Sequence, residues 1–96
     1  MQAPMPDSYK SILTDDVLQD DLAVLLARVL ATANKRAREL GVDVLQSFIT
    51  ISQSFENGSS WRVNYGPEDY IGRRGGDLII EVDAGDVSIK QVLRGQ

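Results

Sequence analysis

The longest apolar pattern in the chain has the spacing of an α-helix. Between Leu18 and Leu40, apolar side chains recur every three or four residues, which places them on one helical face. Aspartates gather near the start of this segment and Lys and Arg near its end, as the helix dipole favours. Thr14 is an N-cap candidate, and Gly41 stands where a left-handed terminator belongs. The pattern therefore predicts one helix of about seven turns, at roughly 3.6 residues each.

After residue 41 the spacing changes to two, the period of a β-strand. A first run covers residues 45–55, with the odd-numbered positions more apolar, and a second covers residues 61–65. Further strands are predicted over residues 77–83 and 87–93. The order predicts an α+β domain in which one long N-terminal helix packs on a four-stranded antiparallel sheet.

The pairing of the first two strands depends on the connection around Asn57-Gly58, which is a hairpin signal. A two-residue turn there sets Trp61 opposite Ser54, whereas a three-residue connection sets Trp61 opposite Phe55. The choice matters because a slip of one residue moves every side chain to the other face. We favour the longer connection, or a bulge, because apolar side chains then share one face. In this register Trp61 lies opposite Phe55, and Tyr65 opposite Ile51.

The last two strands are predicted to pair around a turn at Ala84-Gly85. In the third strand Leu78, Ile80 and Val82 point inward. Pairing Val82 with Val87 then places Ile80 opposite Ile89, which matches apolar faces.

The ends of the chain bear on its organisation and location. Residues 1–8 hold two prolines and little apolar content, so we expect a flexible arm followed by a single domain over residues 9–96. The N-terminus has no basic cluster followed by an apolar run, and no stretch is apolar enough to span a bilayer. With no cysteine in the chain, these features favour a cytoplasmic protein.

The composition excludes several kinds of catalytic and metal-binding site and disfavours some classes of partner. The chain has no His and no Cys, which removes the commonest general base, thiolate nucleophiles and most transition-metal sites. Its net charge of −4 disfavours nucleic acids and anionic membranes as partners, but it is compatible with a basic partner protein. We therefore expect no enzyme activity, no catalytic residues, no cofactor and no metal.

Three stretches together resemble known small domains: residues 61–65, residues 75–83 and residues 92–96. They resemble the C-terminal half of PepSY-type and cystatin-like domains, and small bacterial immunity-type proteins with a nuclear-transport-factor-like fold. The helix end at residues 37–41 is similar to the same layout. The resemblance implies a protein that inhibits or masks a partner protein.

The connection over residues 66–76 is the first candidate site. It carries Asp69, Tyr70, Arg73 and Arg74, and Tyr and Arg are typical of protein-interface hot spots. The alternative is an ordinary strand connection whose glycine pair supplies a bend.

Aromatic residues give a second candidate. Trp61, Tyr65 and Phe48 either belong to the core or line a pocket between helix and sheet. A third interpretation uses Phe48 and Ile79 on the exposed sheet face, or an edge strand, to form a homodimer.

Three functions follow from these candidates. The leading hypothesis is a non-enzymatic protein–protein interaction module, such as an immunity or inhibitor protein that masks a partner. The alternatives are a small-ligand-binding or weakly catalytic domain that uses the concave sheet face, and a homodimeric structural domain.

Overall fold

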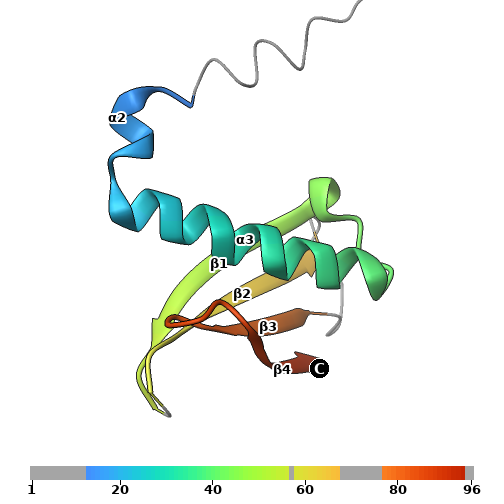
Figure 1. Cartoon of the computed structure of the whole chain (residues 1–96). Helices are drawn as coiled ribbons and strands as arrows, with labels where there is room; N and C mark the ends of the chain where they lie inside the picture. The colour runs from blue at the N-terminus through green and yellow to red at the C-terminus, as the bar shows by residue number, and fades with distance from the viewer. Residues whose placement is uncertain (1–12, 57, 68–76, 95–96) are drawn as a thin grey trace, which may run out of the picture.

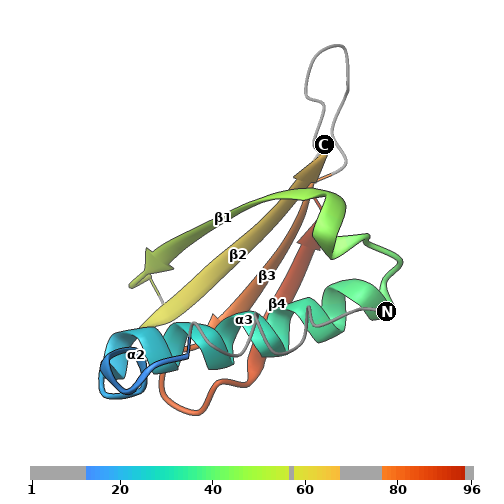
Figure 2. The ribbon, with the colours of Figure 1, turned by 90° about the horizontal axis from the view of Figure 1, so that it is seen from above.

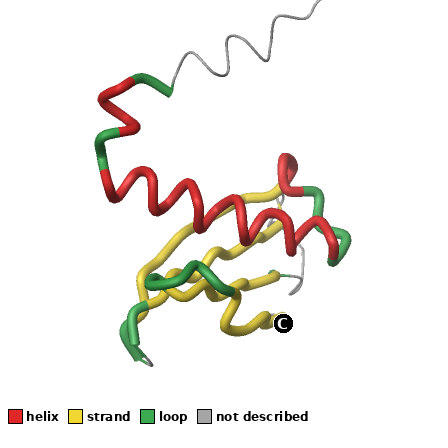
Figure 3. Tube along the Cα trace, in the orientation of Figure 1, coloured by secondary structure: helices red, strands yellow, loops and turns green. Residues whose placement is uncertain are grey.

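The computed structural model describes residues 13–56, 58–67 and 77–94, and it confirms the predicted α+β fold (Figure 1). One long helix packs against a four-stranded antiparallel sheet with strand order β1-β2-β3-β4, so neighbours in sequence are neighbours in the sheet. Figure 3 shows the helices and strands in separate colours along the chain. The elements are α2 (Asp15–Leu18), α3 (Asp21–Glu39), the short 3-10 helix η1 (Val44–Gln46), β1 (Ser47–Ser54), β2 (Ser60–Pro67), β3 (Leu78–Asp83) and β4 (Ile89–Arg94).

The predicted start of the long helix is wrong. The segment is broken at Gln19 and Asp20, so the short helix α2 precedes α3 instead of continuing into it. Asp20 adopts extended backbone angles, and its side chain accepts a hydrogen bond from the Ala23 amide at 2.9 Å. An aspartate in this conformation is a strong N-cap, because it satisfies a free amide at the helix start. Thr14 precedes α2 but makes no side-chain capping bond.

The predicted end of the helix is confirmed. Gly41 has a φ of 89°, in the left-handed region that a residue without a Cβ occupies at little cost. The Val42 amide donates to the Ala37 carbonyl and the Gly41 amide to the Arg38 carbonyl, both at 3.0 Å. This pair of bonds is the Schellman arrangement, which stops the helix and turns the chain toward the sheet.

The first hairpin has the predicted face but not the predicted pairing. Tyr65 lies opposite Ile49, and Trp61 opposite Gln53, so each partner is two residues earlier than expected. The regular pairing ends at residues 54 and 60, which leaves a longer connection than the three-residue one we expected. Odd-numbered residues still face odd-numbered residues, because a shift of two preserves the face. Leu45, expected on the apolar strand face, lies in η1 and is exposed.

The second hairpin also differs in register. Leu78, Ile80 and Val82 are fully buried as predicted, but Val82 pairs with Ile89, and not with Val87. Ile80 likewise pairs with Val92 and not with Ile89, across an irregularity between residues 81 and 82.

A wider turn than expected causes this shift. The Asp83 carboxylate accepts hydrogen bonds from the amides of Gly85 and Asp86, at 2.8 and 3.0 Å. The turn therefore extends over residues 84–86, one residue beyond the predicted Ala84-Gly85 turn, and Val87 stays outside the strand.

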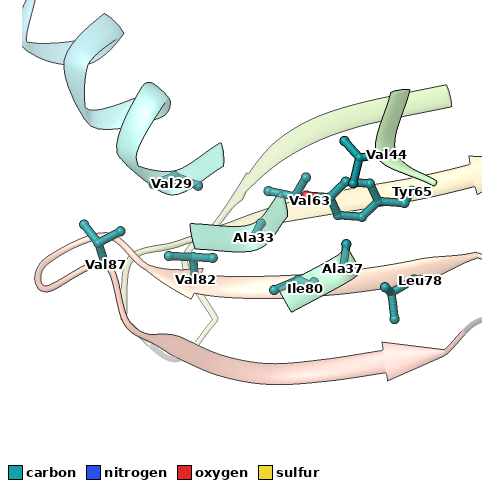
Figure 4. Close-up of a cluster of buried hydrophobic side chains, with 10 residues drawn as sticks. All are labelled: Val29, Ala33, Ala37, Val44, Val63, Tyr65, Leu78, Ile80, Val82 and Val87. Carbon is teal, nitrogen blue, oxygen red and sulfur yellow. The ribbon is translucent and has the colours of Figure 1, made fainter. Parts of the chain in front are cut away.

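The core lies between α3 and the central strands β2 and β3, which the helix contacts. Ala33 and Ala37 are fully buried, and their small side chains let the helix lie close to the sheet. Figure 4 shows the buried cluster, which consists of Val29, Ala33, Ala37, Val44, Val63, Tyr65, Leu78, Ile80, Val82 and Val87. Seen from above, β1 lies clear of α3 (Figure 2).

Candidate functional site

The first predicted site lies outside the described residues. Asp69, Tyr70, Arg73 and Arg74 all fall between residues 68 and 76, and the predicted arm over residues 1–8 is outside as well. The assignment of a partner-binding loop to these residues stays a prediction.

The three aromatic residues of the second predicted site are not brought together. Strand alternation puts Trp61 and Tyr65 on the face toward α3, whereas Phe48, opposite Gly66, is on the other face of the sheet. Trp61 packs against the core, and its indole nitrogen is buried with no hydrogen-bond acceptor among the described residues. Because a solvent-filled pocket would leave that nitrogen accessible to water, this geometry indicates packing.

Tyr65 joins the sheet to the helix. Its side chain is buried, and its hydroxyl donates to Oδ1 of Asn34 on α3 at 2.6 Å. Burial disfavours the charged phenolate and raises the pKa of Tyr65 to about 12, although the nearby Arg38 guanidinium acts in the opposite direction. Tyr65 is therefore a neutral structural link at physiological pH.

A polar cluster on the sheet face away from α3 was not predicted. Glu81 is buried, and its carboxylate accepts hydrogen bonds from Ser60 Oγ and Gln91 Nε2, both at 2.5 Å. Arg62 lies 4.0 Å from the same carboxylate and 3.6 Å from that of Glu56. These bonds, first the one from Ser60, lower the pKa of Glu81. Only the cross-strand register brings these residues together, so the sequence alone does not reveal the cluster.

The chemistry of this cluster is structural. A carboxylate with a lowered pKa is a weak base, so Glu81 is poorly suited to activate the Ser60 hydroxyl. Both side chains are also almost completely buried, which keeps them from a substrate. The cluster instead satisfies a buried charge and ties β2, β3 and β4 together.

A shallow hollow of about 340 Å³ lies beside α3. Its lining residues are Thr32, Lys35, Arg36, Glu39 and Ile89, and they include none of the three aromatic residues of the predicted pocket. Arg36 is already paired with Glu39, at 3.1 Å between Nη1 and Oε1. Among the described residues, Ile89 is the one apolar residue in the lining, whereas ligand pockets are usually lined mainly by apolar side chains.

One group of exposed apolar side chains lies at the start of the described chain. We call residues 13–22 the acidic end. Leu18 is 57% exposed and Leu22 is 55% exposed. By contrast Val29, which lies seven residues after Leu22 on the same face of α3, is fully buried. Leu13 and Val17 are exposed too, and α2 buries no residue. Figure 1 shows α2 standing clear of the sheet.

The acidic end also carries the net charge of the protein. It contains Asp15, Asp16, Asp20 and Asp21, all exposed, and no Lys or Arg. The chain has fourteen acidic and ten basic residues, an excess of four, so the rest of the sequence is balanced at ten and ten. The acidic end therefore combines exposed leucines with an unbalanced negative charge. Its signal, four aspartates within seven residues and no Lys or Arg among residues 13–22, was readable in the sequence, where we assigned it to the helix dipole.

Two other kinds of feature are absent from the described ranges. No group of three or more acidic, His or Cys side chains there is arranged to hold a metal ion, so the four aspartates do not form such a group. Among the same residues, no helix has the length and apolar character needed to cross a membrane.

A scan against protein-family models, a search of curated proteins and a search of solved structures each gave no match to this chain.

Proposed function

We propose that this chain is a non-enzymatic protein-binding module that docks a basic partner protein through the acidic end. The observation that carries the proposal is the coincidence of exposed leucines with the whole excess negative charge of the molecule. Contiguous exposed apolar surface rimmed by polar residues is typical of interaction sites.

The exposed leucines and the aspartates of the acidic end have different roles in binding. Burying an exposed leucine against a partner contributes roughly 1.5–3 kcal/mol, so Leu18 and Leu22 supply affinity. The aspartates orient and accelerate the approach of a cationic surface and exclude acidic competitors. A fitting partner therefore has an apolar patch bordered by Lys or Arg. The masking role implied by the resemblance to immunity-type and inhibitor domains is one form of such binding.

The small-ligand alternative has less support. The helix side of the sheet is filled by the core over β2 and β3, and the shallow hollow beside α3 has little apolar lining to bury a ligand.

Capture from a cell extract by the whole chain, followed by titration of the captured protein, tests the proposal. We expect Leu22→Lys, or Asp15→Asn with Asp16→Asn, to weaken binding of that protein about tenfold or more, and added salt to weaken it further. The matched controls are Leu45→Lys, at a leucine that is 88% exposed, and Asp43→Asn with Glu56→Gln, which changes net charge equally.

The same experiment can also exclude the acidic end as the binding surface. A captured protein that binds all of these variants equally, but is lost with Tyr70→Ala and Arg73→Ala, would place the contact on residues 66–76. Stabilisation of the chain by a metabolite, with no protein partner, would favour the small-ligand alternative.

A further inference from the structure

The two edges of the sheet are protected to different degrees. An exposed edge strand tends to pair with another chain, and natural proteins discourage this with charged side chains, prolines or bulges. Edge strand β4 carries Lys90 and Arg94 and has an irregular register with β3. Edge strand β1, with the sequence Ser-Phe-Ile-Thr-Ile-Ser-Gln-Ser, has no charge and no proline, and it pairs with β2 without interruption over all eight residues.

The free side of β1 is also accessible. No strand among residues 13–56, 58–67 and 77–94 pairs with it, and α3 does not cover it (Figure 2). Ile49 and Ile51, on the helix side, are 37% and 36% exposed, although their neighbours across the hairpin, Tyr65 and Val63, are buried. β1 therefore presents both backbone groups and half-buried apolar side chains to a further strand.

We propose that the occupant of this edge is β1 of a second copy, paired antiparallel about a twofold axis at Thr50. An axis perpendicular to the sheet keeps the helix sides of both copies on the same face, so residues of like parity lie opposite each other. Thr50 then faces Thr50 of the second copy, and Ile49 faces Ile51 of the second copy. Thr–Thr and β-branched pairs are favourable cross-strand neighbours.

Charge selects β1 rather than β4 for this pairing. Two acidic copies repel each other overall, but no charged residue lies along β1, so the pairing creates no like-charge contact between the strands. The same arrangement on β4, centred on Val92, would set Lys90 opposite Arg94 of the second copy, and like charges directly opposite are destabilising. The pairing uses a surface different from the acidic end, so either proposal can fail without the other.

Disulfide trapping tests the register, because the chain contains no cysteine. Facing residues in an antiparallel pair have Cα atoms about 4.5–5.5 Å apart, within the range that a disulfide spans. We expect Thr50→Cys to cross-link to itself at least about tenfold faster than Leu45→Cys, an exposed position outside the strand. Equal rates for the two variants would overturn the proposal.

Sedimentation equilibrium of the unmodified chain provides the second measurement. We expect a dimer whose dissociation constant rises about tenfold or more in Ile51→Lys and stays unchanged in Leu45→Lys. Circular dichroism shows whether each variant is folded. A monomeric native chain, a folded Ile51→Lys variant that still dimerises, or a β1 edge that pairs only with the strand of a different protein would each contradict the proposal.

Discussion

The later turns of α3 and the acidic end have similar apolar spacing but different surroundings. Val29, Ala33 and Ala37 rest on β2 and β3 with no exposed surface, whereas Leu22, on the same helical face, is more than half exposed. Helical periodicity therefore identifies the face of a helix that can be buried, but the extent of the sheet determines which turns are buried. Exposed turns that keep the apolar pattern are available to a partner.

The largest effect is expected where a charge enters the buried half of the helix. Ala33→Asp places a carboxylate with no partner in the core, so we expect the free energy of unfolding to fall by about 3–5 kcal/mol. Ala27→Asp, at an exposed position of the same helix, should cost less than about 1 kcal/mol. Urea denaturation followed by circular dichroism measures both. Equal losses would show that the helix does not rest on the sheet through this face.

A smaller effect is expected from the link between helix and sheet. Tyr65→Phe removes the hydrogen bond to Asn34 and should lower the free energy of unfolding by about 0.5–1.5 kcal/mol near neutral pH.

The same variant changes the pH dependence. The pKa of Tyr65 is raised from 10.0 to about 12 in the folded protein, so its contribution to stability is complete below pH 10 and is lost as the pH rises toward about 12. Denaturation curves on either side of pH 10 should show a steeper alkaline loss in the native chain than in Tyr65→Phe. Identical slopes would mean that the hydroxyl is not buried.

The break between α2 and α3 is expected to contribute about 1 kcal/mol. Asp20→Ala removes the side-chain acceptor of the Ala23 amide, and loss of an N-cap costs about 0.5–2 kcal/mol. Thr14→Ala, at a position with no capping bond, should change stability by less than about 0.5 kcal/mol. The reverse order in thermal denaturation would favour a single unbroken helix from residue 15.

The smallest effect on stability is expected at the acidic end. Leu22→Ala should change the free energy of unfolding by less than about 0.5 kcal/mol, because the side chain is exposed, while Leu78→Ala should cost about 2–5 kcal/mol. Urea titration of both variants tests the contrast. A loss at Leu22 close to that at Leu78 would mean that Leu22 supports the fold and is not free for a partner.

Much of the fold follows from local patterns. The helix end at Gly41, the four strands and the inward side chains of β3 each depend on spacing or on a terminator that neighbouring residues define. The pairing of the strands does not follow from local patterns, because strand register depends on turn geometry. The Asp83 carboxylate widens the second turn, and a reading of strand periodicity does not include that bond.

The candidate site was less predictable than the fold. The aspartates were visible in the sequence, but their assignment to one continuous helix hid the break at Asp20. Exposure of Leu22 depends on where the sheet ends beneath α3, which is a tertiary property that the apolar spacing does not contain.

Val87 makes the turn after β3 unsuitable for the insertion of foreign sequence. It has a φ of 59°, a conformation that a β-branched residue rarely adopts and that costs on the order of 1–3 kcal/mol, yet its side chain is buried in the core. The turn after β3 thus holds the Val87 side chain in the core. A peptide tag or fusion inserted in this turn would remove that side chain from the core. The β1–β2 connection, with exposed Phe55 and Gly58, is the better insertion site for a label.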